Sequence, residues 1–381
     1  MLIVGPISNT GGRAVEAREI FNALNPYYNV SILSTERFDS EITSTSPLLN
    51  TNYKSVDKIL YNSYWIIRII SYMSWLKNFF KGLPTQYVNS KANKKIADLI
   101  NRKKSIISES IKRSDLIFIL MQIESNYLKE IIEYGNSKNI PIIFRPTGEI
   151  IQIPSHIIYL LPYIDKIICH SFKNVESLKA LSKNFTIIDQ NAFEEEKLTK
   201  LPLVIKKPLV FGFLGRFSSE KGGIELASFF SKRTDKFLIA GDGPDKEMIL
   251  KIIENSNYCQ YLGKIQPDQI DGFMKKIDIL IISSKFTETG PYTGIEAMAA
   301  GKIIFSTKVG AMEDRLAVTS NNFWFDVNDQ KTLAKLIDRV NQLTEKELQH
   351  ICITNRIRYC KKYSRTEISK SYLLECKNLL K

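Results

Sequence analysis

The sequence has few of the side chains that build disulfide frameworks and metal centres. It contains three histidines in 381 residues, and these are widely separated. Its five cysteines are an odd number without a CxxC pair, namely Cys169, Cys259, Cys352, Cys360 and Cys376. A disulfide-stapled secreted fold and a structural zinc site are therefore disfavoured, and a reducing cytosol is the expected compartment.

Long apolar runs are also missing. The chain has no stretch of about 18 or more uncharged apolar residues, which argues against a transmembrane helix. Met1 leads directly into LIVGPIS, a run typical of a buried strand, so we expect no signal peptide ahead of the fold. The hydrophobic share of 44% and the charged share of 24% are those of an ordinary soluble globular protein.

Acidic residues are outnumbered, and the net charge is +13. Residues 51–113 hold thirteen Lys or Arg against three Asp or Glu, and residues 351–381 hold eight against two. A concentrated basic face implies a polyanionic partner, such as nucleic acid, an anionic lipid surface or a phosphorylated substrate. The alternative is an ordinary solvated surface on a lysine-rich protein.

Short apolar runs alternate with helical segments along the whole chain. The expected strands are LIVGPI, VSILS, DLIFILM, IPIIFRP, IDKIICHS, LVFGFLG, KFLIAG, YCQYLG, IDILIIS, GKIIFST and NFWFDV. Apolar runs of this kind fit parallel strands buried on both faces, and the alternation with helices favours βαβ units. The fold class expected is α/β, with two Rossmann-like, doubly wound domains facing across a cleft.

The length favours two domains rather than one hydrophobic core. Charge and two prolines separate the halves in KLTKLPLVIKKP, residues 197–208. We therefore expect domains at 1–200 and 201–362, with a last helix at 363–381 that crosses back to the first domain.

One basic segment, residues 61–84, has helical periodicity with a wide apolar face. That face holds Trp65, Ile66, Ile69, Tyr72, Met73, Trp75, Leu76, Phe79 and Phe80, and the opposite side holds Ser63, Ser71, Ser74, Lys77, Asn78 and Lys81. Tryptophan and tyrosine beside lysine are typical of a helix that lies in a membrane surface. A helix packed into the core, with an ordinary polar side, is the alternative.

Two glycine-rich turns follow strands. Gly11 and Gly12 lie between the first strand and its helix, where small residues let backbone amides approach an anion. In the second turn, Arg216 comes directly after a strand and Lys221 follows before Gly222–Gly223 and a helix. Two cations beside backbone amides can neutralise a diphosphate, as a bound divalent ion does elsewhere. The sequence has neither a Walker loop nor GxGxxG at these turns.

A pair of acids occurs in TETGPYTGIEAMAAGKII, residues 287–304. Glu288 falls in a loop after a strand, and Glu296 in the first turns of the following helix. A glycosidase needs its two carboxyl groups roughly 5–10 Å apart across one bond, which this placement does not require. The acids can instead hold sugar and ribose hydroxyls, while amides near the helix start hold phosphate.

These motifs, taken in order, resemble a known family. GRFSSEKGG, IAGDGP, YLGKI, IDILIISS, ETGPYTGIEAMAAGKII and VGAMED match, over about residues 209–328, the nucleotide-sugar-binding domain of glycosyltransferase family four. Members of that family are retaining enzymes of the GT-B fold. The first half is similar more loosely, through NTGGRAVEA, IDKIICHS and QNAF.

The resemblance implies a role for each matching residue. Arg216 and Lys221 would bind the donor diphosphate, Glu288 the donor sugar and Glu296 the ribose, with Lys264 and Ile265 near the base. The remaining donor-side residues would be Gly12, Gly215, Gly290, Pro291, Tyr292 and Thr293. The resemblance further implies that Arg216, Lys221 and Glu288 are catalytic, and that no metal and no cofactor are needed.

The sequence departs from the family pattern at two places. Gly290 and Pro291 stand where the family usually has Phe-Gly, and Arg145 and Thr147 follow the strand after which many members carry a histidine. His170 lies one strand later. Together with Gly11, Arg145 and Thr147 are candidates for the acceptor side.

The function expected is retaining transfer of a hexosyl unit from a UDP- or GDP-sugar to a saccharide or lipid-linked acceptor of surface-polysaccharide synthesis. The enzyme would be cytoplasmic or peripheral on the inner membrane face, with residues 61–113 toward anionic lipid. The alternatives are a GT-B nucleotide-sugar epimerase and a non-enzymatic protein that binds nucleotide sugar or nucleic acid. No recognition helix or RNP-like strand is evident, so nucleic acid is not the expected partner.

Overall fold

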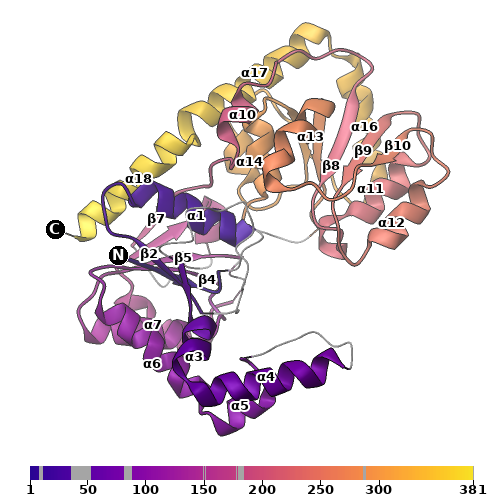
Figure 1. The fold of residues 1–381 in the computed structure, drawn as a ribbon. Helices are drawn as coiled ribbons and strands as arrows, with labels where there is room; N and C mark the ends of the chain where they lie inside the picture. The colour runs from indigo at the N-terminus through magenta and orange to yellow at the C-terminus, as the bar shows by residue number, and fades with distance from the viewer. Residues whose placement is uncertain are drawn as a thin grey trace. The chain divides into compact units, whose positions relative to one another are not determined.

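The computed structural model describes most of the chain. The residues described are 1–7, 12–35, 53–80, 88–148, 150, 152–176, 178, 184–285 and 289–380. They form two compact units. The first unit comprises Met1–Cys169, Val175–Ile187 and Ser369–Lys381, and the second comprises His170–Asn174 and Ile188–Ile368. Figure 1 shows both, each built from strands with helices packed on them.

The first unit contains a parallel sheet with the strand order β3-β2-β1-β4-β5-β6-β7. Its strands are β1 (Leu2–Gly5), β2 (Ser31–Ser34), β3 (Tyr53–Ser55), β4 (Ile117–Met121), β5 (Ile142–Pro146), β6 (Lys166–Cys169) and β7 (Phe185–Ile187). Its helices are α1 (Gly12–Leu24), α3 (Val56–Ser63), α4 (Trp65–Phe79), α5 (Lys91–Ile96), α6 (Leu99–Lys112), α7 (Leu128–Ser137), α8 (Ser155–Ile158) and the 3-10 turn η1 (Leu161–Tyr163). The central strands β4 and β5 are buried along their whole length, as their Ile- and Phe-rich sequences predict.

The second unit contains a parallel sheet with the strand order β10-β9-β8-β11-β12. Its strands are β8 (Val210–Leu214), β9 (Lys236–Ala240), β10 (Cys259–Tyr261), β11 (Ile279–Ile282) and β12 (Ile303–Ser306). The helices along this half are α9 (Phe172–Val175), α10 (Glu195–Thr199), α11 (Gly223–Phe230), α12 (Lys246–Ile253), α13 (Ile270–Lys276), α14 (Tyr292–Ala299), α15 (Met312–Leu316), α16 (Gln330–Gln342) and α17 (Glu345–Lys362), with 3-10 turns η2 (Ser219–Lys221) and η3 (Pro267–Gln269).

Alternate side chains of these strands enter two separate cores. In β11, Ile279 and Ile281 join the cluster on one face, while Leu280 and Ile282 join the cluster on the other. Because successive strand side chains point to opposite faces, an unbroken apolar run is what a sheet covered on both sides requires. The run IDILIIS therefore becomes a central strand.

The last helix, α18 (Arg365–Leu379), begins in the second unit, and its residues from Ser369 onward belong to the first. Tyr372 packs edge-on against Phe118 of β4, with ring centroids 5.9 Å apart. The Glu375 carboxylate accepts a hydrogen bond from the Thr186 hydroxyl at 2.8 Å.

The α/β fold class expected from the sequence is confirmed, and two details of the strand assignment change. NFWFDV was expected to form a strand, but it makes a single bridge, between Ser306 and Trp324, and its Phe323 and Phe325 fill the core. The three-residue strands β3 and β7 were not expected, because so short a run has no period to detect. The domain limits stay a prediction, since compact units are not a test of independent folding.

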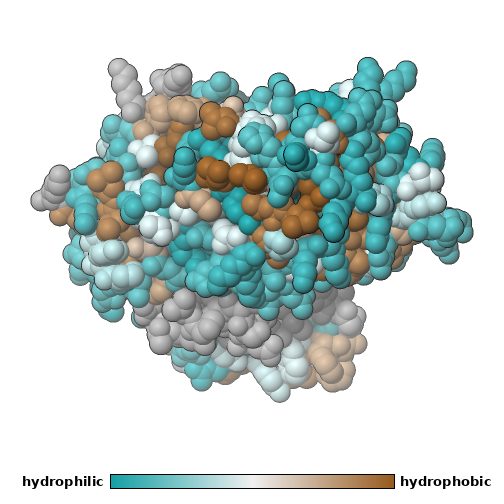
Figure 2. All heavy atoms as spheres, turned by 90° about the horizontal axis from the view of Figure 1, so that it is seen from above, coloured by the Kyte–Doolittle hydropathy of each residue, from teal (hydrophilic) through white to brown (hydrophobic). Residues whose placement is uncertain are grey.

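The surface is mostly hydrophilic on the face that Figure 2 shows, where apolar residues appear in several separate groups. Scattered apolar side chains of this kind are normal on a folded protein and need no partner. Ile353 and Ile357 of α17 are two examples, exposed to 36% and 47%.

Gly222, in the loop after β8, packs closely against Ser283, in the loop after β11. Its substitution tests this close contact between the two loops. Its φ is +69°, and an added Cβ would lie 2.3 Å from the Ser283 carbonyl oxygen. We expect Gly222→Ala to lower the free energy of unfolding by about 1–3 kcal/mol in urea denaturation, since backbone strain and the clash add. Gly272→Ala, in α13 with no neighbour within 4 Å of the added Cβ, should instead stabilise by ~0.5–1 kcal/mol. Equal stability of Gly222→Ala and the parent chain would contradict this close contact.

Candidate active site

The strand order of the second unit reverses between β8 and β11. From β8 the chain adds β9 and β10 on one side, and then returns to add β11 and β12 on the other. In open parallel sheets, the loops that follow the two strands at such a reversal leave a crevice in which ligands bind. The loops after β8 and β11 are the ones that carry Arg216, Lys221 and the GPYT turn.

The first residues of the loop after β8 are held by two backbone hydrogen bonds. The Gly215 amide donates to the Ala240 carbonyl at 3.2 Å, and the Phe217 amide donates to the Asp242 carbonyl at 2.9 Å. These bonds tie GRFS to the GDGP turn after β9. The side chain of Arg216, between them, is exposed at the carboxyl end of the strand.

Lys221 ends the 3-10 turn η2, directly before Gly222 and α11. The Ser283 hydroxyl, just after β11, donates to the Lys221 carbonyl at 2.7 Å, and the Lys285 amide donates to the Glu220 carbonyl at 2.8 Å. The loops after β8 and β11 are therefore joined at the strand reversal.

The charges of this loop act on one another. The neighbouring Ser218 hydroxyl lowers the pKa of the Glu220 carboxyl, and the nearby charges of Arg216 and Lys221 lower it further. The two predicted diphosphate-binding cations thus lie in one loop and near the same carboxylate.

The turn after β11 reaches α14 through GPYT. The Ala311 amide donates to the Thr289 carbonyl at 3.1 Å, and the Thr307 hydroxyl donates to the Ser284 carbonyl at 2.8 Å. Pro291 is the residue before the first turn of α14, so Tyr292 and Thr293 begin the helix at the same edge of the sheet. Phosphate groups bind favourably at such a helix start.

Glu296 lies in the second turn of α14 with its side chain buried. Burial raises the pKa of its carboxyl to about 7, and the positive charge of Arg315 opposes the rise. A carboxyl held at this pKa changes its charge near neutral pH, and a ligand hydroxyl that donates to it would favour the ionised form.

The YLGKI segment completes this edge. The Gly241 amide donates to the Gly263 carbonyl at 2.9 Å, and the Tyr261 hydroxyl donates to the Gly241 carbonyl at 2.9 Å. Lys264 is exposed beyond this bond, and Ile265 is half-buried against the core. The structure therefore brings the predicted donor-side residues from 215 to 296 to one edge of the second sheet, as far as they are described.

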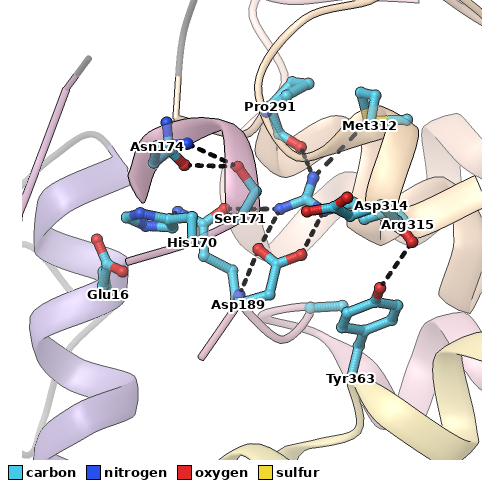
Figure 3. A network of polar contacts seen from close by, with 12 residues as sticks. Glu16, His170, Ser171, Asn174, Asp189, Pro291, Met312, Asp314, Arg315 and Tyr363 are labelled. Atoms are coloured by element: carbon cyan, nitrogen blue, oxygen red, sulfur yellow. Dashed lines mark hydrogen bonds and ion pairs between the residues drawn. The ribbon is translucent and has the colours of Figure 1, made fainter. Parts of the chain in front are cut away.

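Arg315 is a central residue of this unit that the sequence motifs did not indicate. Figure 3 shows its guanidinium between Asp189 and Pro291. Its Nε and Nη2 donate to the two carboxylate oxygens of Asp189, each at 2.8 Å, and its Nη1 donates to the Pro291 carbonyl at 2.6 Å. A Cβ on Gly290 would lie 2.8 Å from its Nη2, so only glycine leaves room there.

The surroundings keep this guanidinium charged. Burial alone would lower the pKa of Arg315, but the Asp189 carboxylate outweighs it and the pKa is raised. Asp189 also accepts from the Gln190 amide at 2.8 Å, and the Gln190 side chain lies 3.4 Å from His170 Nε2. The GPYT turn is thus fixed to the segment at 188–191 by a buried ion pair.

In the first unit, two acceptor-side candidates contact α1. Arg145 of β5 is fully buried, pairs with Glu16 through its Nε, and lies over the Tyr372 ring at 5.6 Å. Thr147 accepts a hydrogen bond from Arg13 Nε at 3.0 Å. This placement holds β5 to α1 and to α18, and a role toward an acceptor stays a prediction.

The other first-unit candidates lie at the start of α1, and one predicted catalytic residue is not placed. Gly12 is the exposed first residue of α1. Gly11 and Glu288 lie outside the described residues, so the roles predicted for them are untested. Among the described residues, no group of three His, Cys, Asp or Glu side chains is arranged to hold a metal ion.

Comparison with solved structures shows the fold class. The chain superposes on Anabaena HepE in complex with UDP with a TM-score of 0.73, 14% identity and 99% of both chains covered. It superposes on a glycosyltransferase from Rickettsia africae with a TM-score of 0.71 and 18% identity, over 100% of this chain and 98% of that one. At these identities the likeness shows the fold alone, and that fold is GT-B.

The second unit also matches a family model. Residues 194–358 match the model described as "Glycosyl transferases group 1". This match confirms the glycosyltransferase resemblance that the motifs carried.

Several curated proteins are similar in sequence to this chain over part of their length. An uncharacterized glycosyltransferase of Methanocaldococcus jannaschii is 26% identical over 204 residues, which are 52% of this chain and 56% of the relative. The lipopolysaccharide 1,2-N-acetylglucosaminetransferase of Salmonella typhimurium is 24% identical over 182 residues, 44% of this chain and 47% of the relative. A protein in the cps region of Klebsiella pneumoniae is 26% identical over 162 residues, 42% of this chain and 39% of the relative. The chain thus aligns with about half of each curated relative or less.

Removing Arg315 should expose how much the second unit depends on its ion pair. Arg315→Ala leaves the Asp189 carboxylate buried without its partner, so we expect the free energy of unfolding to fall by about 3–5 kcal/mol. Urea denaturation of the full chain measures it. The exposed Lys335→Ala on α16 should change stability by less than ~0.5 kcal/mol.

A double variant distinguishes loss of the pair from loss of packing. Arg315→Met with Asp189→Leu removes both charges, and should be more stable than the sum of the single variants predicts. Additive effects would mean that the two side chains act independently.

Proposed function

We propose that the protein is a retaining glycosyltransferase that moves a hexosyl unit from a nucleotide-diphosphate sugar to an acceptor hydroxyl without a metal ion or other cofactor. The observation that carries the proposal is the position of Arg216, Lys221 and the α14 start at the β8/β11 strand reversal. The group 1 family match over residues 194–358 supports it.

In the proposed reaction the donor diphosphate lies against Arg216, Lys221 and the first amides of α14. The bond from the anomeric carbon to the diphosphate breaks, and a bond to the acceptor oxygen forms on the same face of the sugar. The acceptor proton passes to an oxygen of the leaving diphosphate. Arg216 and Lys221 stabilise the negative charge that develops on that leaving group, which is the largest contribution the site offers.

The proposed acceptor is a saccharide or lipid-linked intermediate of surface-polysaccharide synthesis, handled at the cytoplasmic side of the membrane. Names of two relatives support it, the Salmonella lipopolysaccharide enzyme and an alpha-monoglucosyldiacylglycerol synthase of Acholeplasma laidlawii, 27% identical over 140 residues. The proposed donor is a UDP- or GDP-sugar, and HepE, a structural neighbour, was crystallised with UDP.

A thermal-shift screen of UDP-, GDP- and ADP-sugars tests the donor site. A ligand that binds only the folded chain raises its melting temperature, so one sugar nucleotide should stabilise the parent protein. Arg216→Ala and Lys221→Ala should each lower the affinity for that sugar nucleotide roughly tenfold or more, because each removes a charge-assisted contact. Lys251→Ala, the same charge change on the exposed side of α12, should leave affinity unchanged.

Turnover separates transfer from the alternatives. Release of nucleotide that requires an acceptor supports transfer, whereas an altered sugar nucleotide without acceptor would indicate an epimerase. Stabilisation by no sugar nucleotide at all would refute the donor site.

The pH dependence of donor affinity tests the role proposed for Glu296. Its carboxyl has a pKa of about 7 in the ligand-free protein, so it is mostly protonated at pH ~6 and mostly ionised at pH ~8. If ribose hydroxyls donate to the ionised carboxylate, affinity should rise about tenfold between these pH values. A sugar nucleotide is the right titrant, because its diphosphate diester does not titrate there. Calorimetry should show the rise for the parent chain and a flat profile for Glu296→Gln; a flat parent profile would remove Glu296 from the ribose site.

A further inference from the structure

Helix α4 of the first unit presents its apolar side to solvent. The exposed side chains, with their exposed fractions, are Trp65 (72%), Ile69 (50%), Tyr72 (57%), Met73 (65%), Phe79 (63%) and Phe80 (78%). At 100° per residue, positions 65, 69, 72, 73, 79 and 80 fall on one side of the helix. These residues are called the α4 apolar face below. An interpretation of the segment as a core-packed helix is wrong, because a core helix buries this side.

The side of α4 that contacts the protein is partly polar. Its buried residues are Ile67 and Ser71. The Ser71 hydroxyl accepts a hydrogen bond from Asn93 Nδ2 of α5 at 2.9 Å, and the same Nδ2 lies 3.1 Å from the Val88 carbonyl. Figure 1 shows α4 and α5 side by side. Because a buried polar group needs such a partner, this bond fixes which side of α4 turns inward.

Aromatic rings form a row along the outward side. Tyr72 and Trp75 have ring centroids 5.7 Å apart, Trp75 and Phe79 5.4 Å, and Phe79 and Phe80 5.9 Å. Tryptophan and tyrosine, with an apolar body and a polar edge, concentrate where hydrocarbon meets water. A row of this kind, on a helix that buries a serine, matches a helix that lies in a lipid surface.

Positive charge borders the α4 apolar face. By helix geometry Arg68 lies at one edge of the face and Lys77 at the other. The neighbouring α5 exposes Lys91, Lys94 and Lys95. These lysines have no ion pair among those that the structure describes, unlike Lys103 of α6, which is buried 2.6 Å from Asp57.

We propose that α4 lies in the plane of an anionic phospholipid bilayer, with its apolar face among the acyl chains and the bordering lysines and arginine at the lipid phosphates. The charge decides the partner. A second copy of the chain would place one basic border against another, which disfavours pairing, whereas anionic lipid complements it.

The length of α4 fits a position in the surface. Its 15 residues extend about 22 Å, less than the ~30 Å hydrocarbon core. No helix in the described part of the chain is long and apolar enough to cross a membrane. Apolar area and attraction to anionic lipid together set the strength of such binding.

Vesicle flotation of the full-length protein tests the proposal. The protein should float with vesicles of phosphatidylcholine mixed with phosphatidylglycerol, bind pure phosphatidylcholine roughly tenfold more weakly, and release partly in high salt. Ile69→Ser with Phe79→Ser should weaken binding at least about tenfold, because two apolar side chains leave the lipid. Ile353→Ser with Ile357→Ser, which likewise replaces two exposed apolar side chains by serine but on α17, should bind as the parent chain does.

A second variant pair tests the charge. Lys77→Glu with Lys95→Glu should reduce binding to the mixed vesicles at least about tenfold. Lys335→Glu with Lys346→Glu changes the net charge equally, on exposed positions of α16 and α17, and should have little effect. All four residues are exposed, so circular dichroism of each variant should match the parent spectrum.

Three results would overturn the proposal. They are failure of the parent chain to bind the mixed vesicles at low salt, unchanged binding of the Ile69→Ser, Phe79→Ser variant, and a parent dimer that this variant converts to a monomer. The last would show that a second copy covers the α4 apolar face. Donor binding should be the same in every one of these variants, so the result is independent of the proposed glycosyl transfer.

Discussion

Parallel pairing of β8 with β11 is the constraint on which the second unit depends. The two strands are neighbours in the sheet although β9 and β10 lie between them in the chain. Their carboxyl ends therefore meet, and the loops after them are joined by the Ser283 hydroxyl on the Lys221 carbonyl. The predicted donor-side residues in the loops after β8 and β11 owe their position to that pairing, since a loop can only start where its strand ends.

The buried ion pair of Arg315 and Asp189 fixes the turn before α14 to the segment at 188–191. It anchors the Pro291 carbonyl and fills the space beside Gly290, so it explains physically why this chain has glycine at position 290 of that turn. A larger residue at 290 would meet the guanidinium. GPYT departs from the family pattern, and this turn packs directly against the buried Arg315. The turn and the arginine therefore form one packing arrangement.

Much of the fold could be predicted from sequence because its signals are local. Runs such as IDILIIS are apolar over the length of one strand, and glycines and cations follow them at short spacing. Signals that depend on distant residues were not predictable in this way. Arg315 and Asp189 are 126 residues apart, and neither stands out in its own segment. NFWFDV has the composition of a strand, yet its phenylalanines are used to fill the core beside β12.

Helix α4 separates the two kinds of information most clearly. The sequence by itself predicted an amphipathic helix within residues 61–84, with aromatic residues on one side and basic residues near it, because helical periodicity is a property of neighbouring positions; the structure begins α4 at Trp65 and assigns residues 61–63 to α3. The sequence left open which side faces the protein. The tertiary structure decided that, because Asn93 of α5 supplies the hydrogen bond that makes burial of Ser71 favourable, and the aromatic side is left outward.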